Sequence, residues 1–199
     1  MSPVPARLDL ARDLLDRAQQ VRSYRAGHTR GLLTADAISR GQHHEYVTVR
    51  VLQRILADHG WPGPGLVGTD AAEAAWWIAL HADHLPDFQS AALRLVRAAA
   101  EKGEATLRQW AHLHDRCAIR SGMAQSYGTQ YQLGPAGIEP LPVRDPARLD
   151  TRRAQVGLRP AATALQHLRH RYARDPQGAG LHDERAKDDT HADLGRTAA

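Results

Sequence analysis

Apolar residues recur at helical spacing along most of this chain. One stripe lies between residues 5 and 25 and consists of Leu8, Ala11, Leu15, Ala18 and Val21. This spacing places the side chains on one face of an α-helix, so it predicts an amphipathic helix there. Residues 26 to 42 contain three glycines and predict a loop that holds a short helical turn.

Four further helices are predicted by the same spacing and by their boundary residues. They cover residues 43–59, 69–84, 86–101 and 106–119. Thr69 or Asp70 is expected to cap the second of these helices, with Glu73 completing the capping signature. Pro86 suits the first position of the next helix. Because the connections are short, the last three helices should lie side by side and roughly antiparallel.

The pattern changes after Gly122. The segment "YGTQYQLGPAGIEPLPV" alternates around a Gly-Pro-Ala-Gly turn, which indicates an irregular loop or a short β-hairpin. Two short helices are expected to follow, in "DPARLDTRRAQVG", with Asp145 as its cap, and in "RPAATALQHLRHRYAR". The predicted fold is therefore an all-α, single-domain helical bundle with a Gly/Pro-rich loop or short β-hairpin after the fifth helix.

The predicted organisation has three parts. Residues 1–42 form an N-terminal helix and loop, residues 43–174 form the helical core, and residues 175–199 are too polar to join a core and are expected to be disordered. A chain of 199 residues with 42% apolar content can bury a real core within one domain.

Composition also limits the compartment and the partners. Cys117 is the single cysteine, which excludes an internal disulfide. No apolar run approaches the roughly 20 residues that span a bilayer, and the first residues have no signal-peptide core. We therefore expect a cytoplasmic protein with no membrane partner.

The formal charge of +4 is unevenly distributed. Residues 144 to 174 hold eight arginines against two aspartates, whereas the residues from 175 onward hold six acids against three bases. The aromatic residues do not interleave with the arginines as a stacking platform for bases requires. We therefore predict no nucleic-acid partner.

Histidines and acids near two helix ends are the first candidates for chemistry. His81 and His84 are three residues apart, so on a helix they project from one face. His112, Asp115 and Arg116 share a face of the last of these helices. If that face meets the first helix end, His81, His84, Asp115 and Arg116 form one polar pocket.

Such a pocket has two chemical interpretations. A carboxylate–arginine pair with histidines suits acid–base chemistry on an anchored anion. Two histidines and a carboxylate suit a metal ion, although Arg116 would compete for Asp115 and neither an HExxH motif nor a cysteine set is present. Cys117 beside Arg116 is a nucleophile candidate if the guanidinium lowers the pKa of its thiol, and otherwise a core residue.

Several segments together resemble a known family. They are "GWPGPGLVG", "AAWWIALHADHLPDFQ", "HLHDR", "GMAQSYGTQY", "PLPVRDPARLDTRR" and "VGL", within residues 43 to 160. Their order and spacing resemble a bacterial family of uncharacterised proteins classed as a domain of unknown function, with the pattern GWP, HADxxPxFQ, LxDR, QxYGTQ and DxRR. Members of that family usually have an Asn-Thr pair where this chain has Thr48 and Val49.

The resemblance implies a common site without implying a particular reaction. Carried over position by position, it points to His81, Asp83, Gln89, Asp115, Arg116, Gln125, Tyr127, Gly128, Thr129 and Gln130, with Arg152 and Arg153 behind them.

Three functional hypotheses follow. The leading one is a small enzyme that performs hydrolysis, elimination or cyclisation on a small polar or peptide-like substrate, without a cofactor. Its catalytic residues would be His81, Asp83, Asp115, Arg116 and Tyr127, and its substrate-binding residues Gln89, Gln125, Thr129, Gln130, Arg152 and Arg153. The alternatives are a non-catalytic binding or accessory protein whose polar network is structural, and a His/Asp metal-dependent hydrolase. The sequence gives no prediction of oligomeric state.

Overall fold

The computed structural model describes residues 5–135 and 137–174, and these residues are mostly helical. The elements in chain order are α1 (Leu8–Thr29), α2 (Ala35–His59), α3 (Pro64–Val67), α4 (Thr69–Leu80), α5 (Pro86–Glu101), α6 (Leu107–Arg120), β1 (Tyr131–Gly134), β2 (Gly137–Pro140), the 3-10 turn η1 (Pro146–Arg148), α7 (Leu149–Gln155) and α8 (Ala161–Arg174). The predicted all-α bundle, followed by a short antiparallel hairpin, is confirmed. The tail predicted to be disordered, residues 175–199, lies outside the described residues.

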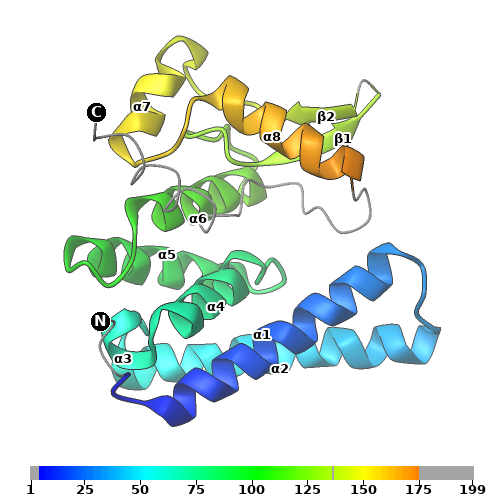
Figure 1. The fold of residues 1–199 in the computed structure, drawn as a ribbon, viewed down its shortest axis with the longest axis vertical. Helices are drawn as coiled ribbons and strands as arrows, with labels where there is room; N and C mark the ends of the chain where they lie inside the picture. The colour runs from blue at the N-terminus through cyan, green and yellow to red at the C-terminus, as the bar shows by residue number, and fades with distance from the viewer. Residues whose placement is uncertain (1–4, 136, 175–199) are drawn as a thin grey trace, which may run out of the picture.

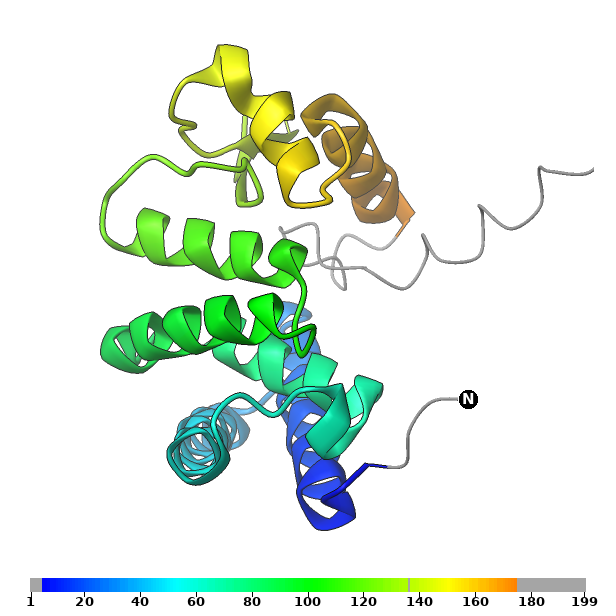
Figure 2. The ribbon, with the colours of Figure 1, turned by 90° about the vertical axis from the view of Figure 1, so that its left-hand side faces the viewer.

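The helices stack in layers (Figures 1 and 2). The pair α1 and α2 forms one end of the stack, α4 packs on α1, and α5 packs on α6. Beyond α6 lie the hairpin, α7 and α8, with α8 packed on β2. We call residues 125–174, which contain these last elements, the C-terminal layer.

One main apolar core extends through the first six helices. Its centre is α4, where every residue from Ala74 to Leu80 is buried. Leu14 of α1, Leu52 of α2 and Leu113 of α6 also belong to this core. Because residues 74–80 of α4 have neighbours on all sides, this part of the helix is apolar all round, unlike a surface helix. Among the described residues, no helix is long and apolar enough to cross a membrane.

The C-terminal layer has only small apolar clusters of its own. One contains Val156 and Leu158 packed on Ala111 of α6, and the other contains Tyr131, Ile138 and Leu168. Few large apolar side chains therefore connect this layer to the rest of the bundle, and polar contacts must supply much of the connection.

The predicted loop over residues 26–42 is wrong, because α1 continues to Thr29 and α2 begins at Ala35. The side-chain oxygen of Thr34 accepts a hydrogen bond from the Ala37 amide and caps α2. Gly41 lies inside α2, where a Cβ atom would come within 2.0 Å of the Tyr24 ring. This glycine permits a close approach between two helices and does not mark a turn.

Helix α4 differs from the prediction in its N-terminal cap and in its C-terminal boundary. The helix does begin at Thr69, but its N-cap is Gly68, and no side chain caps it. Glu73 instead accepts a hydrogen bond of 2.9 Å from the side chain of Gln109. The helix ends at Leu80 rather than His84, so His84 lies in the turn before α5 and does not share a helical face with His81.

Candidate functional site

The carboxylate of Asp115 lies at the centre of the polar residues that the sequence singled out. Asp115 projects from α6 toward residues 125–130, "QSYGTQ", which we call the Gln125–Gln130 loop. The carboxylate accepts hydrogen bonds from the amides of Ser126 at 2.8 Å, Tyr127 at 3.1 Å to each oxygen, and Thr129 at 3.1 Å. The Thr129 hydroxyl donates one more, also at 3.1 Å. Asp115 is 0% exposed, and both of its oxygens bond to this loop, while Oδ1 also lies 3.4 Å from Nδ1 of His114.

Two consecutive arginines of α7 bind the carbonyl groups of the same loop. Nε of Arg152 donates to the Ser126 carbonyl oxygen at 2.8 Å. Nη1 of Arg153 donates to the carbonyl oxygens of Tyr127 at 2.6 Å and Gly128 at 3.1 Å. Arg153 is fully buried, and its Nε also donates to the Arg159 carbonyl oxygen at 2.6 Å. The loop is therefore held on its amide side by α6 and on its carbonyl side by α7.

Gln125 closes the loop on itself. Its Oε1 accepts a hydrogen bond from the Gln130 amide at 2.9 Å, and its Nε2 donates to the Gln130 carbonyl oxygen at 3.0 Å. Nε2 also donates at 2.8 Å to the carbonyl oxygen of Leu141, the residue after β2. Gly128 has a φ of 62°, the left-handed conformation that glycine adopts without strain. The side-chain contacts of Gln125 and the backbone conformation of Gly128 therefore give both residues structural roles.

A chain of hydrogen bonds joins Asp83 to Asp115. Nε of Arg116 donates to Asp83 Oδ1 at 2.8 Å, and its Nη2 donates to Oδ2. Nη1 of Arg116 donates to the Gln130 side-chain oxygen at 3.2 Å, and Gln130 Nε2 lies 3.0 Å from the Thr129 hydroxyl. The structure thus brings together predicted site residues from three segments of the chain.

The electrostatics of Asp83 follow from this contact. Burial raises the pKa of the Asp83 carboxyl, but hydrogen bonding and the charge of Arg116 outweigh burial, so the pKa lies below its ordinary value of 3.8. Asp83 is therefore ionised at neutral pH and acts as the partner of a guanidinium, which makes it a poor proton acceptor.

Gln89 holds the end of α4. It is buried, and its Nε2 donates to the carbonyl oxygens of Ala79 at 3.2 Å and Leu80 at 3.0 Å. Carbonyl groups in the last turn of a helix have no partner within that helix. The side chain predicted to bind substrate therefore caps α4.

Tyr127 belongs to a half-buried aromatic cluster with Trp110 and His114. The ring centroids of Trp110 and His114 each lie 5.7 Å from that of Tyr127, with nearly perpendicular planes. Burial, and then the charge of Asp115, raise the pKa of the Tyr127 hydroxyl above 10.0. The hydroxyl is neutral at physiological pH and is suited to hydrogen bonding rather than to serving as a base.

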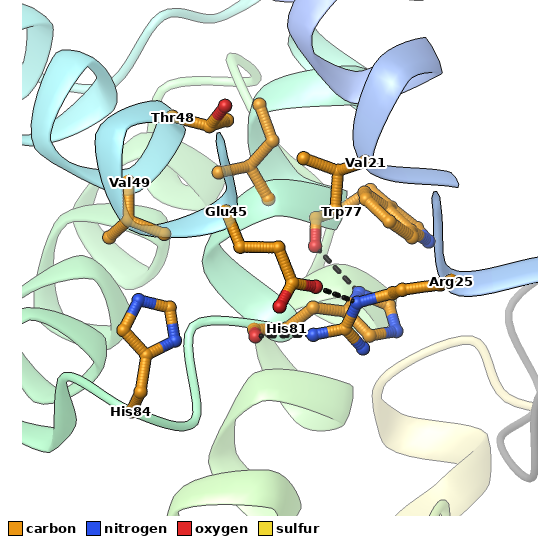
Figure 3. Close-up of a pocket in the computed structure, with 9 residues that line it drawn as sticks. Val21, Arg25, Glu45, Thr48, Val49, Trp77, His81 and His84 are labelled. Carbon is orange, nitrogen blue, oxygen red and sulfur yellow. Dashed lines mark hydrogen bonds and ion pairs between the residues drawn. The ribbon is translucent and has the colours of Figure 1, made fainter. Parts of the chain in front are cut away.

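His81 lies away from this network, at a pocket between α1, α2 and the end of α4 (Figure 3). Its Nδ1 is 2.8 Å from the Trp77 carbonyl oxygen, and the centroids of the two rings are 4.2 Å apart. The enclosed part of the pocket has room for about one water molecule. It is lined by Val21, Arg25, Glu45, Thr48, Val49, Trp77, Ile78, His81 and His84.

The predicted pocket of His81, His84, Asp115 and Arg116 does not form. His81 and His84 face α1 and α2, whereas Asp115 and Arg116 bond toward the Gln125–Gln130 loop. The reason is that α4 ends at Leu80, so the turn that follows directs Asp83 and His84 to different neighbours. His112 lies beside Trp76, with ring centroids 5.9 Å apart.

Sequence reasoning missed Arg25 and Glu45, which face each other across this pocket. Nε of Arg25 donates to Glu45, and its Nη2 donates to the His81 carbonyl oxygen at 3.1 Å. Both residues lie in helices, Arg25 in α1 and Glu45 in α2. The one available signal was the pair Thr48 and Val49, where the resemblance implied a departure from the family pattern; both residues line the pocket.

Cys117 is not an activated nucleophile. Burial, followed by the charge of Asp83, raises the pKa of its thiol to about 11. The charge of Asp83 adds to the effect of burial, so the thiol pKa is raised, whereas the charge of Arg116 was expected to lower it.

Among the described residues, no three His, Cys, Asp or Glu side chains lie close enough to hold a metal ion.

Comparison with known proteins gives one assignment. Neither the curated proteins nor the solved structures include a match to this chain. The model of a family of unknown function, DUF6624, matches residues 25–175. The matched range contains the whole Asp115 network and, from Arg25 onward, most of the pocket lining. The chain therefore belongs to DUF6624, a family of unknown function.

Proposed function

We propose that this chain is a non-catalytic binding or accessory protein whose polar network is structural. The observation that carries this proposal is the state of Asp115, whose buried carboxylate is consumed by five hydrogen bonds from residues 126–129. A carboxylate in that state has no oxygen left for a substrate proton.

The other residues of the network support the same proposal. Arg152 and Arg153 bind loop carbonyls, Gln125 closes the loop, and Gln89 caps α4. Each of these contacts satisfies a backbone group that folding removes from water. In this proposal, the residues singled out by the family resemblance are mainly those that hold the C-terminal layer on α6.

Chemical unfolding tests the proposal. Asp115→Asn places an amide donor against backbone amides, and Arg153→Met leaves buried carbonyls without a donor, so each should lower the free energy of unfolding by about 3 kcal/mol. Glu101→Gln is the matched control, because Glu101 forms an exposed pair with Arg97 on α5. A functional site residue would instead leave stability unchanged or raised. Wild-type stability in both network variants would contradict the proposal.

Acid–base catalysis at the pocket is the second candidate, and the contact between His81 and Trp77 favours it. A ring nitrogen that donates to a carbonyl carries the proton, so Nε2 is the nitrogen of neutral His81 that accepts one. Glu45 and His84 line the same pocket. Turnover in a panel of small amides and esters, lost in a folded His81→Gln variant, would support this candidate. Turnover that persists in the variant would remove it.

A further inference from the structure

Tyr127 is held by its backbone, and its side chain reaches the surface. The amide of Tyr127 donates to Asp115, and its carbonyl oxygen accepts a hydrogen bond from Nη1 of Arg153 at 2.6 Å. The side chain is half-buried, and its hydroxyl forms no hydrogen bond with another described residue. The network that holds the Gln125–Gln130 loop therefore does not use this hydroxyl.

Arg144 is held beside the same loop in a similar way. Its amide donates to the Gln125 carbonyl oxygen at 2.9 Å, and its carbonyl oxygen accepts a hydrogen bond from Nη2 of Arg152. The side chain is exposed, and within the part of the chain that the structure describes its guanidinium has no hydrogen-bond or ion-pair partner. A fixed backbone that carries an unpaired guanidinium is suited to binding a carboxylate from another molecule.

The aromatic cluster of Trp110, His114 and Tyr127 extends this surface toward α5. All three side chains are half-buried. The guanidinium of Arg97 lies 4.8 Å from the ring centroid of Trp110. In Figure 1, the end of α5, the start of α6 and α7 lie on the same side of the stack. We call Arg97, Trp110, His114, Tyr127 and Arg144 the Tyr127 surface.

Positive charge predominates at the Tyr127 surface. Arg97, Arg144 and Arg152 lie close enough for their charges to act on the Tyr127 hydroxyl. Among the described residues, the one carboxylate whose charge also acts on this hydroxyl is that of Asp115. Asp115 is buried beneath the loop, so a partner at the surface meets the arginines and not this carboxylate.

Two exposed acids lie near these arginines and occupy two of them. Glu101 accepts a hydrogen bond of 3.3 Å from Arg97. Asp145 lies 3.8 Å from Nη1 of Arg152. Arg144 is therefore the cation of the group that has no acid of its own within the described residues, and it should be the main contact for an external anion.

The residue types of the Tyr127 surface are typical of protein interfaces. Tyrosine, tryptophan and arginine are the residues that most often supply binding energy there. Arginine clusters recognise acidic peptide motifs through charge-assisted hydrogen bonds.

We infer that the Tyr127 surface binds an acidic peptide segment of a partner protein, an inference that rests on the proposed binding function. Carboxylates of the segment lie on Arg144 and Arg97, and a main-chain carbonyl of the segment accepts a hydrogen bond from the Tyr127 hydroxyl. An apolar side chain between the acids packs on Trp110 and His114. Complementary charge gives such a contact its specificity.

An NMR titration of the isotope-labelled full chain tests the inference. The probe is the peptide Glu-Glu-Phe-Glu-Glu, and Gln-Gln-Phe-Gln-Gln is its neutral counterpart. The acidic peptide should shift the indole N–H signal of Trp110 and leave that of Trp61 in place. The neutral peptide should bind roughly tenfold more weakly. No binding of the acidic peptide at millimolar concentration, or equal binding of the neutral one, overturns the inference.

Two arginine variants separate this surface from general attraction by a basic protein. Arg144→Ala should weaken binding of the acidic peptide roughly fivefold and leave the free energy of unfolding unchanged. Arg148→Ala is the matched control, because it removes the same charge from an 81% exposed side chain outside the surface. It should bind the peptide as the unmodified chain does. Equal weakening in both variants overturns the inference.

Tyr127→Phe tests the hydroxyl. This variant keeps the ring against Trp110 and should weaken binding of the acidic peptide about threefold, as expected for one lost hydrogen bond. A ten-nucleotide oligothymidylate examines the other class of anionic partner. If it shifts the Trp110 signal at a lower concentration than the acidic peptide does, the assignment to a protein partner is overturned.

Failure here is distinguishable from failure of the proposed function. If the acidic peptide does not bind while Asp115→Asn and Arg153→Met remain strongly destabilising, the assignment of the Tyr127 surface is overturned and the structural role of the network stands.

Discussion

The carboxylate of Asp115 and the backbone amide of Ser126 form a buried hydrogen bond of 2.8 Å between α6 and the loop that follows it. Together with the amides of Tyr127 and Thr129, this contact removes three loop amides from solvent. We therefore predict that these amides exchange hydrogen with solvent as slowly as amides in the helical core. Hydrogen exchange measured residue by residue checks this. The first-turn amides of the exposed residues Ala35 and Asp36 in α2 are the reference, and equal rates in both segments would contradict the prediction.

Acid should weaken the contact between Asp83 and Arg116. Since the pKa of Asp83 in the folded protein lies below the ordinary 3.8, the unfolded chain binds more protons as the pH falls toward that range, and stability is lost. Asp83→Asn should lower the free energy of unfolding by about 1 kcal/mol at pH 7, and this difference should shrink below about pH 4. Urea unfolding at a series of pH values measures it. A difference that stays constant down to pH 3 would be inconsistent with this pKa.

Cys117 should resist alkylation in the folded protein. With a pKa of about 11 instead of 9.0, its thiol yields about a hundredfold less thiolate at neutral pH. Iodoacetamide labelling followed by mass spectrometry should therefore be slow at pH 8 and accelerate steadily toward pH 11. The same labelling in denaturing urea is the control, and equally rapid labelling in both conditions would disprove the raised pKa.

Gly41→Ala should destabilise the contact between α1 and α2. The new Cβ would lie 2.0 Å from the ring of Tyr24, so the helices must separate, at about 1–3 kcal/mol. In a Tyr24→Ala background the same change should be neutral or stabilising by up to about 1 kcal/mol, because alanine favours helix more than glycine. A double-mutant cycle of unfolding free energies measures the coupling. An identical effect in both backgrounds would rule out the steric explanation.

The sequence predicted helices well where apolar spacing and boundary residues agreed. Helix α5 begins at Pro86 as expected, and α6 begins after Thr106, whose side chain forms a capping box with Gln109. The prediction failed at a glycine, because glycine can either form a turn or allow two helices to approach closely. Gly41 was interpreted as a loop residue, yet it allows contact with a ring from another helix. Such a contact depends on tertiary structure and leaves no local signal.

The candidate site was predicted in part for a similar physical reason. The convergence of Asp83, Arg116 and Gln130 was expected from the family resemblance, and Arg116 does contact both of the others. The role of the site residues was harder to predict, because the sequence alone does not distinguish an aspartate that binds loop amides from one that binds a substrate. The contact between Arg25 and Glu45 was not predicted. Arg25 was expected to lie outside the core segment of residues 43–174, and Glu45 lies near the start of that segment.

The contacts of Asp115 also have the form of an anion receptor that the chain fills with its own side chain. Successive amides and a hydroxyl that converge on one negative group resemble the backbone concavities that bind phosphate and other oxyanions. An Asp115→Gly variant would empty this receptor, and formate or acetate should then rescue its melting temperature in proportion to concentration, whereas chloride at equal ionic strength should not. Folding of the C-terminal layer would in that variant become a response to a small carboxylate in solution.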